Sequence, residues 1–148
     1  MSANYFERMY FSVKLWLFLL ALSLTFYIAV WAALDVVPAV IATFLLLLAL
    51  MLLNTRSTTI RIENQKLHVG FATIELAYLG TITLLEDFAQ YSKSNRPIDP
   101  AGFLQTKFWI KSAVKIELAD KSDPTPFWII SSRRAKDLSN LLLKLKTN

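Results

Sequence analysis

The chain has 148 residues, 55% of them hydrophobic, and carries 16 Lys and Arg against 11 Asp and Glu, for a net charge of +5. Once its most apolar stretch is set aside, the length leaves room for one compact soluble core and not for two. The sequence contains no cysteine, which excludes disulfide bonds, thiolate metal sites and thiol nucleophiles.

Residues 15–53 are almost entirely apolar, with one acidic residue, Asp35, near the middle. Residues 15–33 would extend about 29 Å as a helix and residues 36–53 about 27 Å, and both lengths approach the thickness of a bilayer core. The first run is too long for a signal peptide, and a second span follows it at once. We therefore predict a transmembrane hairpin, with residues 1–54 forming the N-terminal segment and the membrane anchor.

The basic residues that flank the hairpin predict its orientation. Arg8 and Lys14 precede the first span, and Arg56, Arg61 and Lys66 follow the second, whereas the short connection has neither Lys nor Arg. The positive-inside rule then places both termini in the cytosol. We expect a multi-pass protein of the plasma membrane, and the lack of ionisable groups within the spans argues against a transport role.

Beyond residue 54 the apolar residues alternate with polar ones, as they do in strands with one buried face. Four strands are expected in a first sheet, at residues 58–63, 66–70, 72–76 and 80–85. Asn64 and Gln65 fit a tight turn between the first two strands. The polar stretch 86–102 is expected to be a long loop with one helical turn near residues 87–91.

A second sheet is expected from strands at residues 103–110, 114–118 and 127–131. Pairing the first two as a hairpin with Lys107 opposite Glu117 and Trp109 opposite Lys115 brings favourable partners together across the strands. The third strand is apolar on both faces. The register of the hairpin follows from this choice of side-chain partners.

The chain ends in an amphipathic pattern, which predicts a helix. Apolar residues recur at helical spacing along one face, and Ser131 or Ser132 can cap its start; the stripe comprises Ala135, Leu138, Leu141, Leu142 and Leu145. The predicted fold is thus α+β: a transmembrane hairpin, then a seven-stranded module over residues 55–148 that ends in this helix. The order of elements resembles the pleckstrin-homology (PH) superfold, so we expect a cytosolic PH-like domain.

Residues 122–134, with the sequence SDPTPFWIISSRR, are more distinctive than the topology. Together with Phe108-Trp109 and the apolar hairpin, this segment resembles an actinobacterial family of two-pass membrane proteins that is catalogued as a domain of unknown function. That family often has Pro after the paired arginines, where this chain has Ala135. The resemblance implies location and architecture, and it implies no activity.

Arg133 and Arg134 are the first candidate site, for contact with a partner or an anion. Cations at a helix N-terminus oppose the helix dipole by roughly 0.3 to 1 kcal/mol each, so the pair needs an offset. Pairing with Asp123 or Asp137 would supply one, and a phosphate-bearing partner would supply another. The alternative is a structural role, in which residues 123–126 form a turn and Ser132 caps the helix.

The second candidate site is a basic face formed by Lys107, Trp109, Lys111 and Lys115. Such a face can simply be solvated, or it can lie against anionic lipid headgroups. The motifs of nucleic-acid binding are missing, so no nucleic-acid partner is expected.

No spacing of residues predicts a catalytic centre, a metal site, a cofactor or a small-molecule substrate, and we expect a protein that is not an enzyme. The preferred interpretation is a membrane-anchored binding or scaffold module, acting as a small subunit or organiser of a membrane protein complex and contacting the bilayer and a protein partner. The alternative is a module that docks on anionic lipid headgroups through its basic face.

Overall fold

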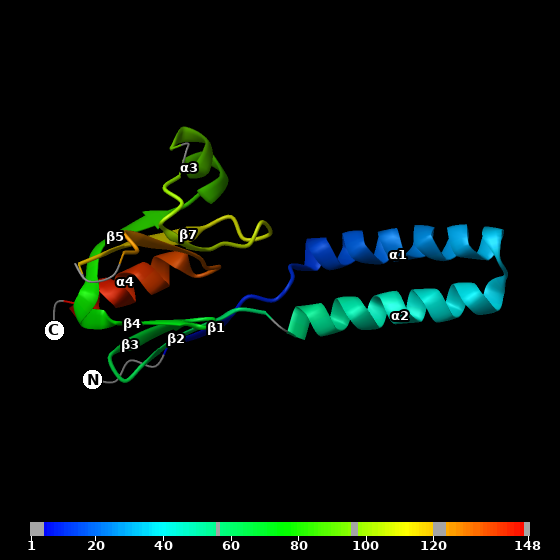
Figure 1. The fold of residues 1–148 in the computed structure, drawn as a ribbon, viewed down its shortest axis with the longest axis horizontal. Coiled ribbons are helices and arrows are strands. Elements are labelled where there is room, and N and C mark those ends of the chain that lie inside the picture. Colours follow the sequence, from blue (N-terminus) through cyan, green and yellow to red (C-terminus); the bar gives the residue numbers. More distant parts are fainter. Residues whose placement is uncertain (1–4, 56, 96–97, 120–123, 147–148) are drawn as a thin grey trace. The chain divides into compact units, whose positions relative to one another are not determined.

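The computed structural model describes residues 5–55, 57–95, 98–119 and 124–146. The chain divides into two compact units (Figure 1). One comprises Met1–Met9 and Thr58–Asn148 and is called the module below; the other is Tyr10–Ser57, the helical pair. The expected boundary at residue 54 stays a prediction, and the structure adds the N-terminal strand Tyr5–Arg8 to the module.

The helical pair consists of α1 (Val13–Ala33) and α2 (Val36–Thr55), and both helices are long and apolar enough to cross a membrane. The Asp35 carboxylate accepts a hydrogen bond from the first N–H of α2, with an N–O distance of 2.6 Å. At the other end, the Asn54 side chain accepts the Phe11 N–H at 2.9 Å and so joins the end of α2 to the start of α1. The prediction of two long apolar helices is confirmed.

The first sheet of the module has four antiparallel strands in the order β1-β2-β3-β4. These are β1 (Tyr5–Arg8), β2 (Thr59–Glu63), β3 (Lys66–Val69) and β4 (Ala72–Glu75). Asn64 and Gln65 both have positive φ, 51° and 61°, as a two-residue turn between twisted strands requires. The predicted hairpin is confirmed.

The second sheet also has four strands, in the order β5-β7-β8-β6, with β6 parallel to β8. They are β5 (Leu79–Leu85), β6 (Phe103–Gln105), β7 (Ala113–Leu118) and β8 (Phe127–Ser131). β8 lies between two neighbours, and Trp128, Ile129 and Ile130 are all buried. At such an interior position, a strand that is apolar on both faces can bury both of them.

Three helical segments complete the module: η1 (Leu76–Tyr78), α3 (Phe88–Ser94) and α4 (Ala135–Lys146). α4 contributes its apolar stripe to the main core, which residues from both sheets share. α3 packs Phe88 and Tyr91 against a second cluster on the other face of β8, around Ile129. The C-terminal helix is confirmed, and the turn expected near residue 87 is a seven-residue helix.

The expected strand set is wrong in two respects, since eight strands are described and β5 belongs to the second sheet. β1 was not expected because its inward-facing residues include a glutamate. η1 separates β4 from β5, and β5 then runs close to β7: a Cβ atom on Gly80 would lie 2.8 Å from the Glu117 carbonyl oxygen. Only glycine allows that approach.

The expected hairpin of residues 103–110 and 114–118 is also wrong. β6 ends at Gln105 and pairs with β8, whereas β7 pairs with β5 and β8. The Phe103 and Trp128 rings, which are partners in this parallel pairing, lie 4.7 Å apart between centroids. Residues 106–112 form a loop, so Lys107 does not face Glu117 across a ladder, and Trp109 does not face Lys115.

Candidate functional site

A buried carboxylate joins the N-terminal strand of the module to the segment just before its C-terminal helix. Glu7, on β1, is 6% exposed. Its oxygens accept hydrogen bonds from the Tyr5 hydroxyl at 2.7 Å, the Ser132 hydroxyl at 2.5 Å and the Arg133 N–H at 2.8 Å. A buried carboxylate needs such donors, because burial otherwise penalises its charge. β1 is thereby fixed to the segment between β8 and α4.

The paired arginines lie immediately before α4 and contribute to the same junction. The Arg134 guanidinium donates to the Phe6 carbonyl oxygen at 2.8 Å and lies 5.0 Å from the centre of the Tyr5 ring. The Ser132 hydroxyl accepts the Arg134 N–H at 3.0 Å. The anion beside this helix start is Glu7, which the sequence did not suggest; Asp123 lies outside the described residues.

Tyr5 gives this junction a measurable dependence on pH. Burial, together with the hydrogen bond to Glu7, raises the pKa of Tyr5 to about 12, although Arg134 acts in the opposite direction. The unfolded chain releases this proton near its ordinary pKa of 10. The folded state is therefore favoured fully below pH 10, and the contribution is lost as the pH rises from about 10 to about 12.

We expect Tyr5→Phe to flatten the fall in unfolding free energy of the module over that alkaline window. The change removes the hydroxyl that titrates and leaves the ring beneath Arg134. Denaturation of the detergent-solubilised chain at several pH values checks this, with Tyr78→Phe, an exposed tyrosine, as the control. An unchanged alkaline slope in Tyr5→Phe would contradict the assignment.

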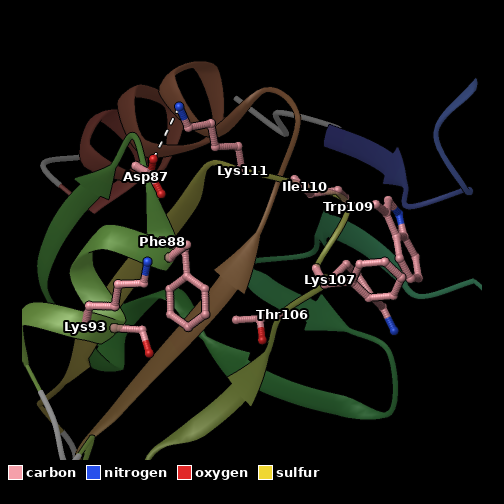
Figure 2. A pocket seen from close by; sticks show the side chains of 11 residues that line it. Asp87, Phe88, Lys93, Thr106, Lys107, Trp109, Ile110 and Lys111 are labelled. Atoms are coloured by element: carbon pink, nitrogen blue, oxygen red, sulfur yellow. Dashed lines mark ion pairs between the residues drawn. The ribbon is translucent and has the colours of Figure 1, made fainter. Parts of the chain in front are cut away.

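A cavity of about 530 Å³ opens beside α3. One side is formed by α3 and the other by residues 106–111 (Figure 2). Phe88 and Trp109 provide aromatic surface, and Lys93, Lys107 and Lys111 bring positive charge to the lining. Figure 2 shows the Phe88 ring between Lys93 and Thr106, with Trp109 on the far side of Lys107. We call this cavity the α3 pocket.

The two walls of the α3 pocket are fastened to each other. The Phe88 N–H donates to the Lys111 carbonyl oxygen at 2.9 Å, and the Lys111 ammonium lies 3.2 Å from the Asp87 carboxylate. Asp87 also caps α3 by accepting the Gln90 N–H at 3.1 Å. That backbone hydrogen bond, followed by Lys111, lowers the pKa of Asp87. These contacts fix the two walls of the α3 pocket relative to each other.

The structure brings together three of the four residues of the predicted basic face. Lys107, Trp109 and Lys111 all line the α3 pocket, and the Lys107 ammonium lies 5.8 Å from the Trp109 ring centre. Lys115 is on β7 instead, 3.4 Å from Glu117 and 5.1 Å from the Phe127 ring. Lys115 is not among the residues that line the α3 pocket.

Sequence reasoning missed Glu7 and the α3 wall of the pocket. Phe88 and Lys93 belong to a segment that was expected to be mostly loop, and their approach to residues 106–111 depends on the order of strands in the second sheet. One signal was available: Asp87 stands three residues before Gln90 at the start of an apolar pair, which is typical of a helix N-cap.

Comparison with protein families gives a match over residues 4–142 to the family described as "Protein of unknown function (DUF3093)". No curated protein and no solved structure matches the chain. The expectation of a family of unknown function is confirmed, while the actinobacterial origin and the specific signature of residues 122–134 stay predictions.

Proposed function

The chain belongs to this family of proteins of unknown function, and we propose that it is a membrane-anchored binding module. In this proposal the helical pair crosses the plasma membrane and the module lies in the cytosol. The module binds a protein partner without catalysing a reaction. It acts as a small subunit or organiser of a membrane protein complex.

The exposure of the helical pair supports its insertion in a bilayer. In the most apolar window of each helix only 6% of the residues are buried, so neither resembles the core helix of a soluble protein. Water would be a poor solvent for this surface, whereas lipid tails are a good one. Arg8 before α1, Lys14 in its first turn, and Arg61 and Lys66 after α2 support a cytosolic module.

The arrangement of the module supports a PH-like fold. Two four-stranded sheets share one core with a C-terminal helix that contacts β5 and β7. Fold alone does not define the ligand, which has to come from the site.

The α3 pocket is the observation that carries the proposal. Its volume suits one or two large side chains, and it combines aromatic walls with lysines, a combination typical of binding sites. A segment that fits it would insert an apolar side chain beside Phe88 and Trp109. The same segment would bring carboxylates near Lys93 and Lys107. The expected partner is therefore an acidic and apolar protein segment at the cytosolic face of the membrane.

Site-specific photo-crosslinking in native membranes tests this proposal. A photoreactive amino acid replaces Ala89, which lines the pocket, and in the control it replaces Asn64, in the turn between β2 and β3. We expect one protein adduct of defined mass at Ala89 and none at Asn64. Lys93→Glu with Lys107→Glu should weaken the adduct. Equal adducts at both positions, or lipid adducts alone, would contradict the proposal.

Docking of the basic face of Lys107, Trp109, Lys111 and Lys115 on lipid headgroups stays a prediction; the first three line the α3 pocket, and Lys115 is paired with Glu117. Arg134 stays a candidate contact, and its guanidinium donates a hydrogen bond to the Phe6 carbonyl oxygen. Arg133 is exposed and stays a candidate contact.

A further inference from the structure

We infer that the module docks on the bilayer that holds its own helical pair, by inserting Phe71 and Phe108 into the lipid headgroup region. The inference rests on the proposed membrane insertion and adds a second, peripheral membrane contact. Phe71 is fully exposed, at 110% of the reference area, and Phe108 is 85% exposed. Exposed aromatic side chains of this size are costly in water.

Both aromatic residues lie at one end of the module. Gly70, with a φ of +62°, turns the chain into Phe71 and packs against Thr58 and Gln105. Its N–H donates to the Thr59 carbonyl oxygen at 2.9 Å, and the Gln105 amide donates to the Thr58 hydroxyl at 2.8 Å. β6 ends at Gln105, and the loop that contains Phe108 begins there.

The same end is where the chain passes to the helices. The Met9 N–H donates to the Thr58 carbonyl oxygen at 3.0 Å, where β1 ends and β2 is about to begin. From Met9 to the start of α1 the chain can reach at most about 14 Å, and from Thr58 back to the end of α2 at most about 11 Å. Two short linkers therefore tether this end of the module to the helices that the proposal places in the membrane.

The loop that carries Phe108 is fixed by several contacts, so the ring is exposed because of the loop's structure and not because the loop is loose. The Lys107 N–H donates to the Ser131 hydroxyl at 3.0 Å, and Ser112 exchanges two hydrogen bonds with Ser132. Ile110 is buried at 5% exposure and anchors the loop in the core. Figure 1 shows this loop, in yellow, reaching toward the end of the module at which β1 ends.

The surroundings of Phe108 favour lipid over another surface. The Trp109 ring meets Phe108 edge to face, with 4.8 Å between centroids, and Lys107 lies beside Trp109. Amphipathic aromatic rings concentrate at the level of lipid headgroups. A lysine at that depth is attracted by anionic lipids. An aromatic pair with an adjoining cation, at the end of the module where the chain leads into the helices, matches that interface.

Fluorescence quenching in reconstituted vesicles tests the inference. Because the chain has no cysteine, Phe71→Cys, Phe108→Cys and Asn64→Cys can each carry one environment-sensitive dye. Asn64 is the control, since the β2–β3 turn lies at the opposite end of the first sheet from the β3–β4 turn. In vesicles with spin-labelled and anionic lipids, we expect the dyes at 71 and 108 to be quenched about twofold more than the dye at 64.

A coupling variant shows whether the two rings act together. Phe108→Ser should reduce the quenching of a dye at position 71, whereas Tyr78→Ser, an exposed aromatic beside the β2–β3 turn, should leave it unchanged. Leu24→Cys, within α1, reports separately on bilayer insertion. Strong quenching at 24 with equal, weak quenching at 71, 108 and 64 would overturn this inference alone. No quenching at 24 would overturn the membrane anchor and this inference with it.

Discussion

Glu7→Ala is expected to lower the free energy of unfolding of the module by about 3 to 5 kcal/mol. The change leaves the Tyr5 and Ser132 hydroxyls and the Arg133 N–H without their acceptor. It also removes the anion beside the start of α4. These partners are separated from Glu7 by as many as 126 positions, so the loss should release β1 from the rest of the module.

Urea denaturation of the full chain in detergent measures this effect. All variants also carry Trp16→Phe and Trp31→Phe, so that the measured tryptophan fluorescence comes from the module alone. Glu75→Ala is the matched control, because Glu75 is an exposed glutamate of the same sheet paired with Lys66 at 3.3 Å, and such pairs contribute about 0 to 1 kcal/mol. Glu7→Gln, which keeps one acceptor, should fall between them. Equal effects of Glu7→Ala and Glu75→Ala would contradict the account of the junction.

Leu138→Ala is expected to cost about 3 kcal/mol. Leu138 has no exposed surface and lies on the face of α4 that packs into the shared core. Truncation removes buried methyl groups and leaves a cavity that two rigid sheets close poorly. Leu143→Ala, on the same helix at 45% exposure, is the matched control and should cost less than about 1 kcal/mol.

The same urea titration separates these two leucine variants. A midpoint lowered strongly by Leu138→Ala and only slightly by Leu143→Ala would support α4 as part of the core. Comparable midpoints would mean that α4 contributes little to the stability of the module, contrary to the structure.

The parts of the fold that could be predicted are those encoded by local pattern. The two apolar runs of the helical pair, the stripe of α4 and the Asn64-Gln65 turn each depend on neighbouring residues, and all three are confirmed. β5 belongs to the second sheet because η1 separates it from β4 and because Gly80 allows it to approach Glu117 on β7 closely. No local sequence pattern predicts that β5 joins the second sheet.

The candidate site was harder to predict because its partners are distant in sequence. From the sequence, a glutamate on β1 is expected to face solvent. Its burial is explained only by the hydrogen bonds from Ser132 and Arg133, which are distant in sequence. The register proposed for residues 103–118 assumed that neighbouring strands pair, whereas β8 lies between β7 and β6. Lys107 and Trp109 were both placed on the predicted basic face, yet their pocket partner Phe88 was not foreseen, because α3 reaches them only through that strand order.

The most direct test of the membrane-anchored module is cysteine accessibility in intact cells, which the absence of native cysteine makes clean. Leu34→Cys places a thiol between α1 and α2, and Glu75→Cys places one on the surface of the module. A membrane-impermeant maleimide should label Leu34→Cys in intact cells and Glu75→Cys only after permeabilisation. Labelling of Glu75→Cys in intact cells, or protection of Leu34→Cys until permeabilisation, would contradict a two-span anchor with a cytosolic module.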